Sequence, residues 1–139
     1  MIEFRALEVQ MPDIDIPSVR KWIQEVITRD DAVPGDLVYL FCNDEHILKT
    51  NRQFLSHDYY TDIITFDYSR GKYISGDMVI SLDTVRTNAQ RVGEGYEREL
   101  LRVIIHGILH LLGVKDKGDG EREIMEQREN EALALYYNR

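Results

Sequence analysis

The chain has 139 residues, of which 43% are hydrophobic, and this size and composition fit one compact domain with a buried core. Its 25 acidic residues outnumber 17 lysines and arginines, and the net charge of −8 argues against general affinity for nucleic acid, DNA included. The single cysteine, Cys42, excludes an internal disulfide and fits a reducing cytoplasm. With neither a secretory leader nor a membrane-spanning stretch in the sequence, we expect a cytoplasmic domain without a membrane anchor.

Alternating apolar residues and turn signals predict two strands and two helices in the first half of the chain. In chain order, these are a strand over 2–9, a helix from Pro17 to about Arg29, a strand over 37–42 and a helix from Asp44 to about Leu55. Asp44 is expected to cap the second helix, and residues 33–36 are expected to form a turn. The first helix should bury the apolar face formed by Val19, Trp22, Ile23, Val26 and Ile27.

The second half predicts two strands followed by three helices. These are strands over 61–66 and 78–81, joined by a turn over 69–72, and helices from Asp83 to about Gln90, from Tyr96 to Leu112 and from Glu121 to about Tyr136. The residues expected to face inward on the last helix are Ile124, Met125, Ala132 and Leu135. The sequence therefore predicts a single α+β domain over 1–139, with a small, mostly four-stranded mixed sheet packed with helices around the helix of 96–112.

The most informative run lies at the end of that central helix. His106 and His110 are four residues apart, so their rings lie on one helix face, as do the paired histidines of H-E-x-x-H enzymes. Gly113 is suited to end the helix in a left-handed conformation, and Asp116 then stands at the offset where metzincins place their third ligand. A bare histidine pair on an apolar helix is more often structural. The added glycine and carboxylate favour a zincin-like HGxxHxxGxxD site for one zinc ion.

The residue after the first histidine sets this site apart from peptidases. In H-E-x-x-H enzymes that residue is the glutamate that acts as general base, and here it is Gly107. Metal-assisted hydrolysis remains possible without it, because a bound ion itself lowers the pKa of water. The sequence thus favours a metal-dependent hydrolase whose base, if it needs one, comes from another part of the chain.

Several blocks of the sequence resemble the YbeY-type endoribonucleases, which act as rRNA maturation factors in bacteria. The family string H-G-x-L-H-L-x-G is present over residues 106–113, and residues 61–66 (TDIITF) and 76–81 (GDMVIS) are similar to two family strands. Asn51, Met125 and Glu129 also stand where the family has the same residue types. The resemblance implies cleavage of single-stranded RNA, 3′-end maturation of the 16S rRNA of the small ribosomal subunit, and ribosome quality control.

Two departures from the family pattern concern the site. Asp116 stands where the family ends its motif with histidine, so the metal role passes to a carboxylate, which also binds zinc. Leu55 stands where the family commonly has an arginine thought to serve the nuclease chemistry. Arg52, one turn earlier, and His57, a candidate proton carrier, are the weak substitutes that the sequence offers.

Three functions stay open from the sequence. The first is a zinc-dependent endoribonuclease with single-stranded RNA and the ribosome as partners. The second is a metallopeptidase or another metal-dependent hydrolase, and the third is a non-catalytic ribosome-associated factor with a structural metal. For the first, attack by an activated water and attack by a neighbouring ribose 2′-hydroxyl are equally compatible with the residues.

Overall fold

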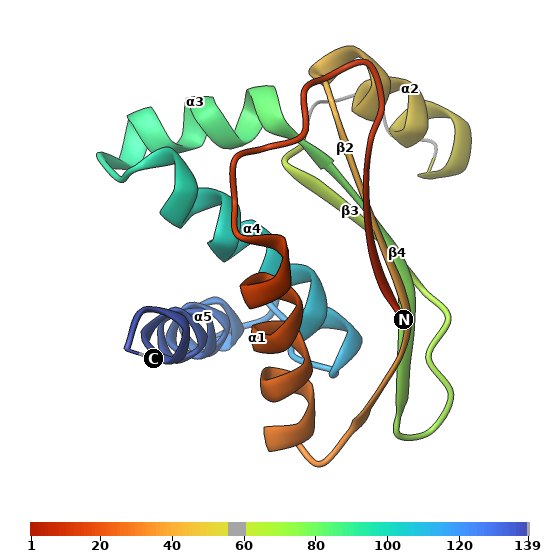
Figure 1. Cartoon of the computed structure of the whole chain (residues 1–139), viewed down its shortest axis with the longest axis vertical. Helices are drawn as coiled ribbons and strands as arrows, with labels where there is room; N and C mark the ends of the chain where they lie inside the picture. The colour runs from red at the N-terminus through yellow and green to blue at the C-terminus, as the bar shows by residue number, and fades with distance from the viewer. Residues whose placement is uncertain (56–60, 139) are drawn as a thin grey trace.

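The computed structural model describes residues 1–55 and 61–138, and within these ranges the chain forms four strands and five helices (Figure 1). In chain order they are β1 (Ile2–Ala6), α1 (Ile16–Arg29), β2 (Val33–Cys42), α2 (Asp44–Leu55), β3 (Ile63–Asp67), β4 (Tyr73–Ser81), α3 (Leu82–Val92), α4 (Tyr96–Leu111) and α5 (Glu121–Tyr137). This architecture confirms the predicted α+β fold with a four-stranded mixed sheet.

The sheet has the strand order β1-β2-β4-β3. β1 pairs parallel with β2, and β2 pairs parallel with β4, so both of these connections cross over through helices. β3 pairs antiparallel with β4 and forms one edge. The register sets Ile63 opposite Ile80 and Thr65 opposite Met78, so these side chains share one face of the sheet.

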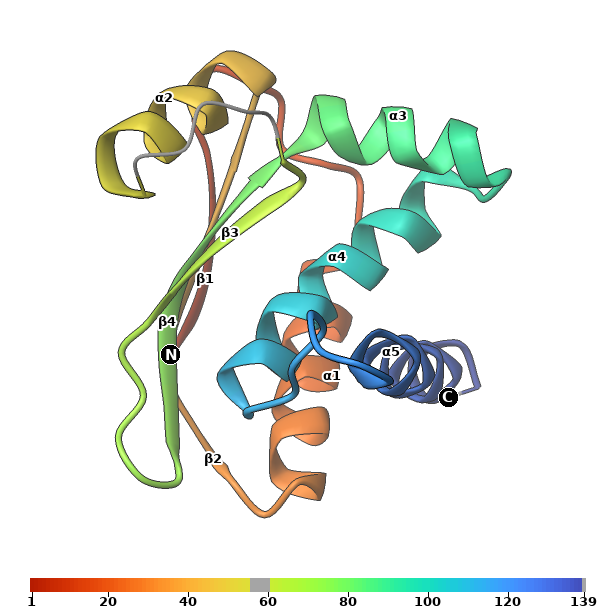
Figure 2. The ribbon, with the colours of Figure 1, turned by 180° about the vertical axis from the view of Figure 1, so that it is seen from behind.

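The two faces of the sheet are covered unequally. Helices α1, α4 and α5 lie on one side, and α2 lies on the other side near one end (Figures 1 and 2). Met78 and Ile80 on β4 point into the large core under α4, whereas Val79 between them packs with Cys42 and Ile47 beneath α2. This alternation follows the two-residue period of a strand. It places α4 against the larger of the two hydrophobic clusters.

Buried hydrogen bonds join α4 to the sheet and α1 to α5. The Tyr39 hydroxyl on β2 donates to the carbonyl of Ile104 at 2.9 Å, in the middle of α4. The indole N–H of Trp22 on α1 donates to the carbonyl of Ala132 on α5 at 2.7 Å. Both donors are completely buried, and such bonds specify position as well as satisfying polar groups. None of the described helices is both long and apolar enough to cross a membrane.

Some predicted boundaries differ from those observed. β2 begins at Val33, not at 37, because the expected turn pairs with β4 through a register shift between Pro34 and Leu37. Proline is tolerated at such an irregularity because its missing N–H is not needed there. β4 likewise begins at Tyr73, and β1 ends at Ala6, shortly before Glu8 takes a positive φ of 57°.

Two further predictions were wrong in detail. Asn43, not Asp44, caps α2, since its Oδ1 accepts from the backbone N–H of His46 at 2.9 Å. The Asp44 carboxylate instead accepts from the hydroxyls of Ser81 and Thr84, and so ties α2 to the start of α3. On α5, Ile124 is 55% exposed, while Met125, Ala132 and Leu133 are buried. The buried face of α5 is therefore rotated away from Ile124, which leaves room for Glu129 to face inward.

Gly107 lies where α4 packs tightly against the sheet. A Cβ added at this position would lie 3.0 Å from both Ile63 Cδ1 and Met78 Cγ. Any larger side chain would have to displace these two residues, since the layer between helix and sheet is filled. The position that carries the general base in H-E-x-x-H enzymes thus faces the apolar core in this protein.

We expect Gly107→Glu to destabilise the fold by at least about 3 kcal/mol, because it both overpacks the core and buries a carboxylate without a partner. Urea unfolding followed by circular dichroism measures the change. Gly107→Ala is the control: a gain in helix propensity of about 1 kcal/mol opposes the tight contact, so a shift below about 1 kcal/mol is expected. A wild-type unfolding midpoint for Gly107→Glu would contradict the close packing described here.

Candidate metal centre

Three side chains meet at the C-terminal end of α4. His106 Nε2 lies 3.4 Å from Asp116 Oδ2, and His110 Nε2 lies 3.3 Å from the same oxygen. One ligand atom from each residue falls within 4.8 Å of the others, and all three residues are half-buried. The predicted His106, His110 and Asp116 therefore come together as a cluster that could hold a metal ion.

The turn after α4 brings Asp116 to the two histidines. The backbone N–H of Gly113 donates to the carbonyl of His110 at 3.0 Å, and that of Val114 donates to the carbonyl of Leu109 at 2.9 Å. This pair of bonds is a Schellman motif, in which the residue after the helix cap takes a left-handed conformation. Gly113 has φ of 95°, which confirms the expectation that it ends the helix in this way. The chain then reverses toward the face of α4 that carries the rings.

A second contact orients each imidazole ring. His110 Nδ1 lies 3.1 Å from the carbonyl oxygen of Val114, an acceptor that the Schellman turn itself puts in place. His106 Nδ1 lies 2.6 Å from Glu129 Oε2, on α5. Since both partners accept hydrogen bonds, they favour the tautomer with the proton on Nδ1, which leaves the Nε2 lone pair available to a metal ion.

Burial and neighbouring charges shift the pKa values of the two histidines in opposite directions. Burial alone would lower the pKa of His106, but the hydrogen bond and charge of Glu129, with the charges of Asp62 and Asp116, raise it overall. The pKa of His110 is lowered by burial and by the neighbouring His106. Burial also raises the pKa of Asp62, against the opposing charge of His106. The two rings therefore have different electrostatic surroundings, although the Nε2 atoms of both face the same Asp116 oxygen.

Two cavities border the cluster. The α2–β3 cavity has a volume of about 440 Å³ and is lined by all three cluster residues, with Thr61, Thr65, Lys117 and others. The α3–α5 cavity has a volume of about 530 Å³, and its lining includes His106 and Asp116 together with side chains of α3, α4 and α5. Asp62 lines both cavities. His106 and Asp116 therefore lie between two hollows of the surface.

The remaining candidates from the sequence lie apart from the cluster or outside the described residues. Arg52 is exposed on the last turn of α2, and the side chains through which α2 lines the α2–β3 cavity are Asn51 and Leu55. Leu55 is thus an apolar lining residue where the family commonly has arginine. His57 lies outside the residues that the structure describes.

Sequence reasoning assigned no role to Glu129 or Arg102, although both border the cluster. Glu129 is 7% exposed and follows Met125 by four residues on the buried face of α5. A carboxylate in the register of a buried apolar face is a usable signal, because a buried charge needs a partner. Its partners are His106 and Arg102, 23 and 27 residues earlier in the chain.

The donor set fits zinc. In a tetrahedral site with bonds of about 2.0–2.1 Å, neighbouring ligand atoms are separated by about 3.3–3.4 Å. The two distances from Asp116 Oδ2 to the imidazole nitrogens have these values. Two neutral imidazoles and one carboxylate also match the three-ligand composition of catalytic zinc sites, which keep a fourth position for water or substrate.

Comparisons with known proteins identify the fold and the family of this chain. A solution structure of a Thermotoga maritima protein aligns with a TM-score of 0.69 at 24% identity, covering 99% of this chain and 90% of that one, which shows a shared fold. A protein of Phocaeicola vulgatus named "Endoribonuclease YbeY" is 58% identical over 97% of this chain and 98% of its own length. A Bacteroides thetaiotaomicron protein of the same name is 56% identical, over 96% of this chain and 98% of that protein.

The family model described as "Endoribonuclease YbeY" matches residues 6–137, which include the three cluster residues, both lined cavities and Glu129. The match thus spans nearly the whole fold, with the α4 helix and the turn that follows it. The chain belongs to the YbeY endoribonuclease family.

Proposed function

We propose that this protein is a zinc-dependent endoribonuclease that cleaves single-stranded RNA. We further propose that it acts in the cytoplasm with the ribosome as partner, in 3′-end maturation of 16S rRNA and in ribosome quality control. Membership of the family implies RNA endonuclease activity. The single observation that supports the zinc assignment best is the matching separation of Asp116 Oδ2 from the two imidazole nitrogens.

His106, His110 and Asp116 are the residues that would hold the ion. When bound, zinc supplies Lewis-acid chemistry, by which a phosphoryl oxygen is polarised or the pKa of a water molecule is lowered. The protein's own contribution is orientation. Glu129 and the Val114 carbonyl each accept a hydrogen bond from an imidazole Nδ1. The Nε2 atoms of both rings therefore stay available to donate a lone pair to the ion. Half-burial of the three residues limits competition from bulk water.

The α2–β3 cavity is the better place for the scissile phosphodiester. All three cluster residues line it, whereas the lining of the α3–α5 cavity includes His106 and Asp116 but not His110. Thr61, Thr65 and Lys117 add hydroxyl and ammonium groups, which are suited to phosphate oxygens and ribose hydroxyls. A volume of about 440 Å³ is large enough for about one nucleotide.

The two alternatives from the sequence have less support. A metallopeptidase of the H-E-x-x-H type needs a base after the first histidine, and Gly107 faces Ile63 and Met78 instead. A non-catalytic factor with a structural metal would be expected to close the site with a fourth protein ligand. Within the described residues, the cluster has three members.

We expect Asp116→Ala to lower RNA cleavage more than about 100-fold, because loss of a ligand should exceed the 10–100-fold effect of changing an outer-shell partner. The measurement uses a labelled single-stranded RNA that carries a 16S 3′-end precursor sequence. Asp119→Ala is the matched control, since Asp119 is an exposed carboxylate of the same loop outside the cluster, and it should cleave at the wild-type rate.

Equal cleavage by wild type and Asp116→Ala, at matched circular dichroism spectra, would contradict a role for the metal centre in the reaction. Duplex RNA and DNA of the same sequence test the preference for a single RNA strand. Turnover of a peptide but not of RNA by the zinc-loaded protein would instead favour the metallopeptidase.

Removal of the metal should lower the melting temperature, because an ion that binds only the folded state stabilises it. At a free zinc concentration 100 times the dissociation constant, the gain is about 2.7 kcal/mol, or roughly 5–10 °C for a chain of this size. Scanning calorimetry with zinc and with excess chelator measures the shift, and Asp116→Ala should show little of it. Elemental analysis of protein purified without added metal identifies the native ion, and an unchanged melting curve would argue against tight binding.

A further inference from the structure

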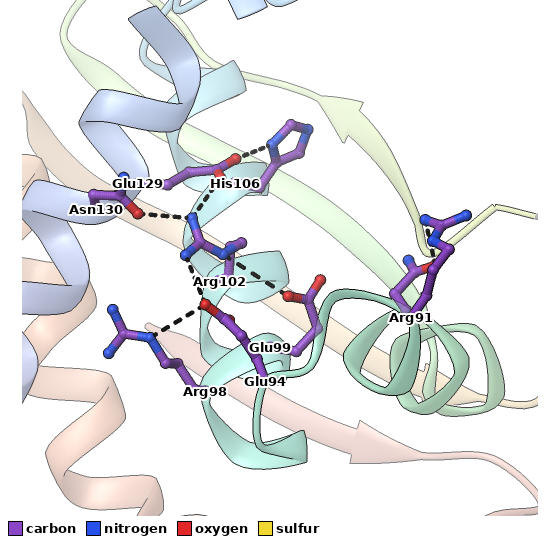
Figure 3. A network of polar contacts seen from close by, with 9 residues as sticks. Arg91, Glu94, Arg98, Glu99, Arg102, His106, Glu129 and Asn130 are labelled. Atoms are coloured by element: carbon purple, nitrogen blue, oxygen red, sulfur yellow. Dashed lines mark hydrogen bonds and ion pairs between the residues drawn. The ribbon is translucent and has the colours of Figure 1, made fainter. Parts of the chain in front are cut away.

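We propose that Arg102 is a positioning residue of the metal centre: it holds the carboxylate of Glu129, which in turn fixes the ring of His106. The inference rests on the proposed metal site and adds a residue that does not itself reach the three ligands. The contacts that carry it form one connected network between α4 and α5 (Figure 3).

Arg102 bridges the two helices next to the site. It stands four residues before His106 on α4, so both side chains leave the same face of the helix. Its Nη1 donates to Glu129 Oε1 at 3.2 Å and to Asn130 Oδ1 at 3.0 Å, both on α5. The Arg102 side chain is 19% exposed, so these bonds compete only weakly with water.

The two oxygens of Glu129 have separate partners. Oε1 accepts from Arg102, and Oε2 lies 2.6 Å from His106 Nδ1. A carboxylate held at one oxygen by a guanidinium has its second oxygen aimed by the plane of the group. Arg102 therefore fixes the rotation of the group that orients His106.

Without Arg102, acidic side chains would face one another at this place. Its Nη2 lies 3.7 Å from Glu94 Oε1, and its Nε lies 3.8 Å from Glu99 Oε1, in addition to the contact with Glu129. Burial raises the pKa of Glu99; Arg102 opposes this shift, whereas Glu94 and Glu129 add to it. Loss of the cation would leave these carboxylates to repel one another, which favours rotation of Glu129 and weakens its bond to His106.

The shape of the guanidinium matters as well as its charge. Arg102 directs separate N–H groups toward Glu94, Glu99 and the pair on α5 (Figure 3). A lysine ammonium is a point charge on a flexible stem and cannot reproduce this fork. We therefore expect Arg102→Lys to retain only part of the effect, and Arg102→Met to lose it.

The first test measures zinc affinity by competition with a chromophoric chelator, which reads the site without any RNA. Arg102→Met should bind zinc about 10-fold more weakly than wild type, at the lower end of the range for outer-shell partners. Arg98→Met is the matched control: Arg98 lies one turn earlier on α4 and pairs with Glu94 at 3.7 Å, but it contacts neither Glu129 nor His106 in the described network. Its zinc affinity should equal that of wild type.

A double-mutant cycle separates positioning through Glu129 from general loosening of the helices. If Arg102 acts through Glu129, Arg102→Met should cause little further loss of zinc affinity in a Glu129→Gln background. Wild-type zinc affinity in folded Arg102→Met, or losses that multiply in the double variant, would overturn the proposal.

A measurement on the unmutated protein covers the case in which Arg102→Met fails to fold. Nitrogen-15 NMR of the metal-free protein should show the His106 Nδ1 protonated and in a strong hydrogen bond. An Nδ1 without a proton would overturn the proposal. These readouts are also distinct from the proposed function: if wild type binds zinc and cleaves RNA while Arg102→Met binds equally well, only the positioning role fails.

Discussion

The reversal of the chain after α4 is the constraint on which the site depends. Two histidines one helical turn apart offer two nitrogens, but a third ligand must come from beyond the helix. The Schellman turn at Gly113 supplies it within three residues, and the same turn presents the Val114 carbonyl to His110. Backbone geometry, more than any side-chain contact, thus brings Asp116 to the two histidines.

The large apolar core holds α4 in place, and so fixes where the chain reverses after it. α4 is buried along most of its length, and Gly107 lets it lie close to β3 and β4. The Tyr39 hydroxyl pins the middle of the helix to β2. As a result, the end of α4 emerges beside the edge strand β3, where the α2–β3 cavity lies. The polar site sits at the rim of the core, half-buried, and is positioned by the packing beneath it.

Local patterns made much of this arrangement predictable. The period of the α4 residues, the glycine at 113 and the offset of Asp116 are all encoded within 11 consecutive residues, so they could be recognised without long-range information. The presence of four strands and the buried face of α1 followed from periodicity in the same way. The predictions that were wrong concerned features that depend on contacts between distant segments. Asn43 takes the capping role because Asp44 is engaged by Ser81 and Thr84, and no local rule anticipates that exchange.

The network around Glu129 could not be derived from the sequence for a related reason. A glutamate on a largely polar helix is ordinary, and its importance follows from the rotation of α5 that buries Met125 and Leu133 but exposes Ile124. Only the packing of α5 on α4 brings it to His106 and Arg102. The position of Glu129 among buried apolar residues was the available clue.

The two imidazoles differ in what holds their outer nitrogens, and this difference bears on how the site can evolve. The ring of His110 is oriented by a main-chain carbonyl, which every amino acid at position 114 would supply. The ring of His106 is oriented by a side chain, which one nucleotide change can remove. A substitution at Glu129 can therefore change the orientation of His106, whereas the orientation of His110 is inherited with the fold.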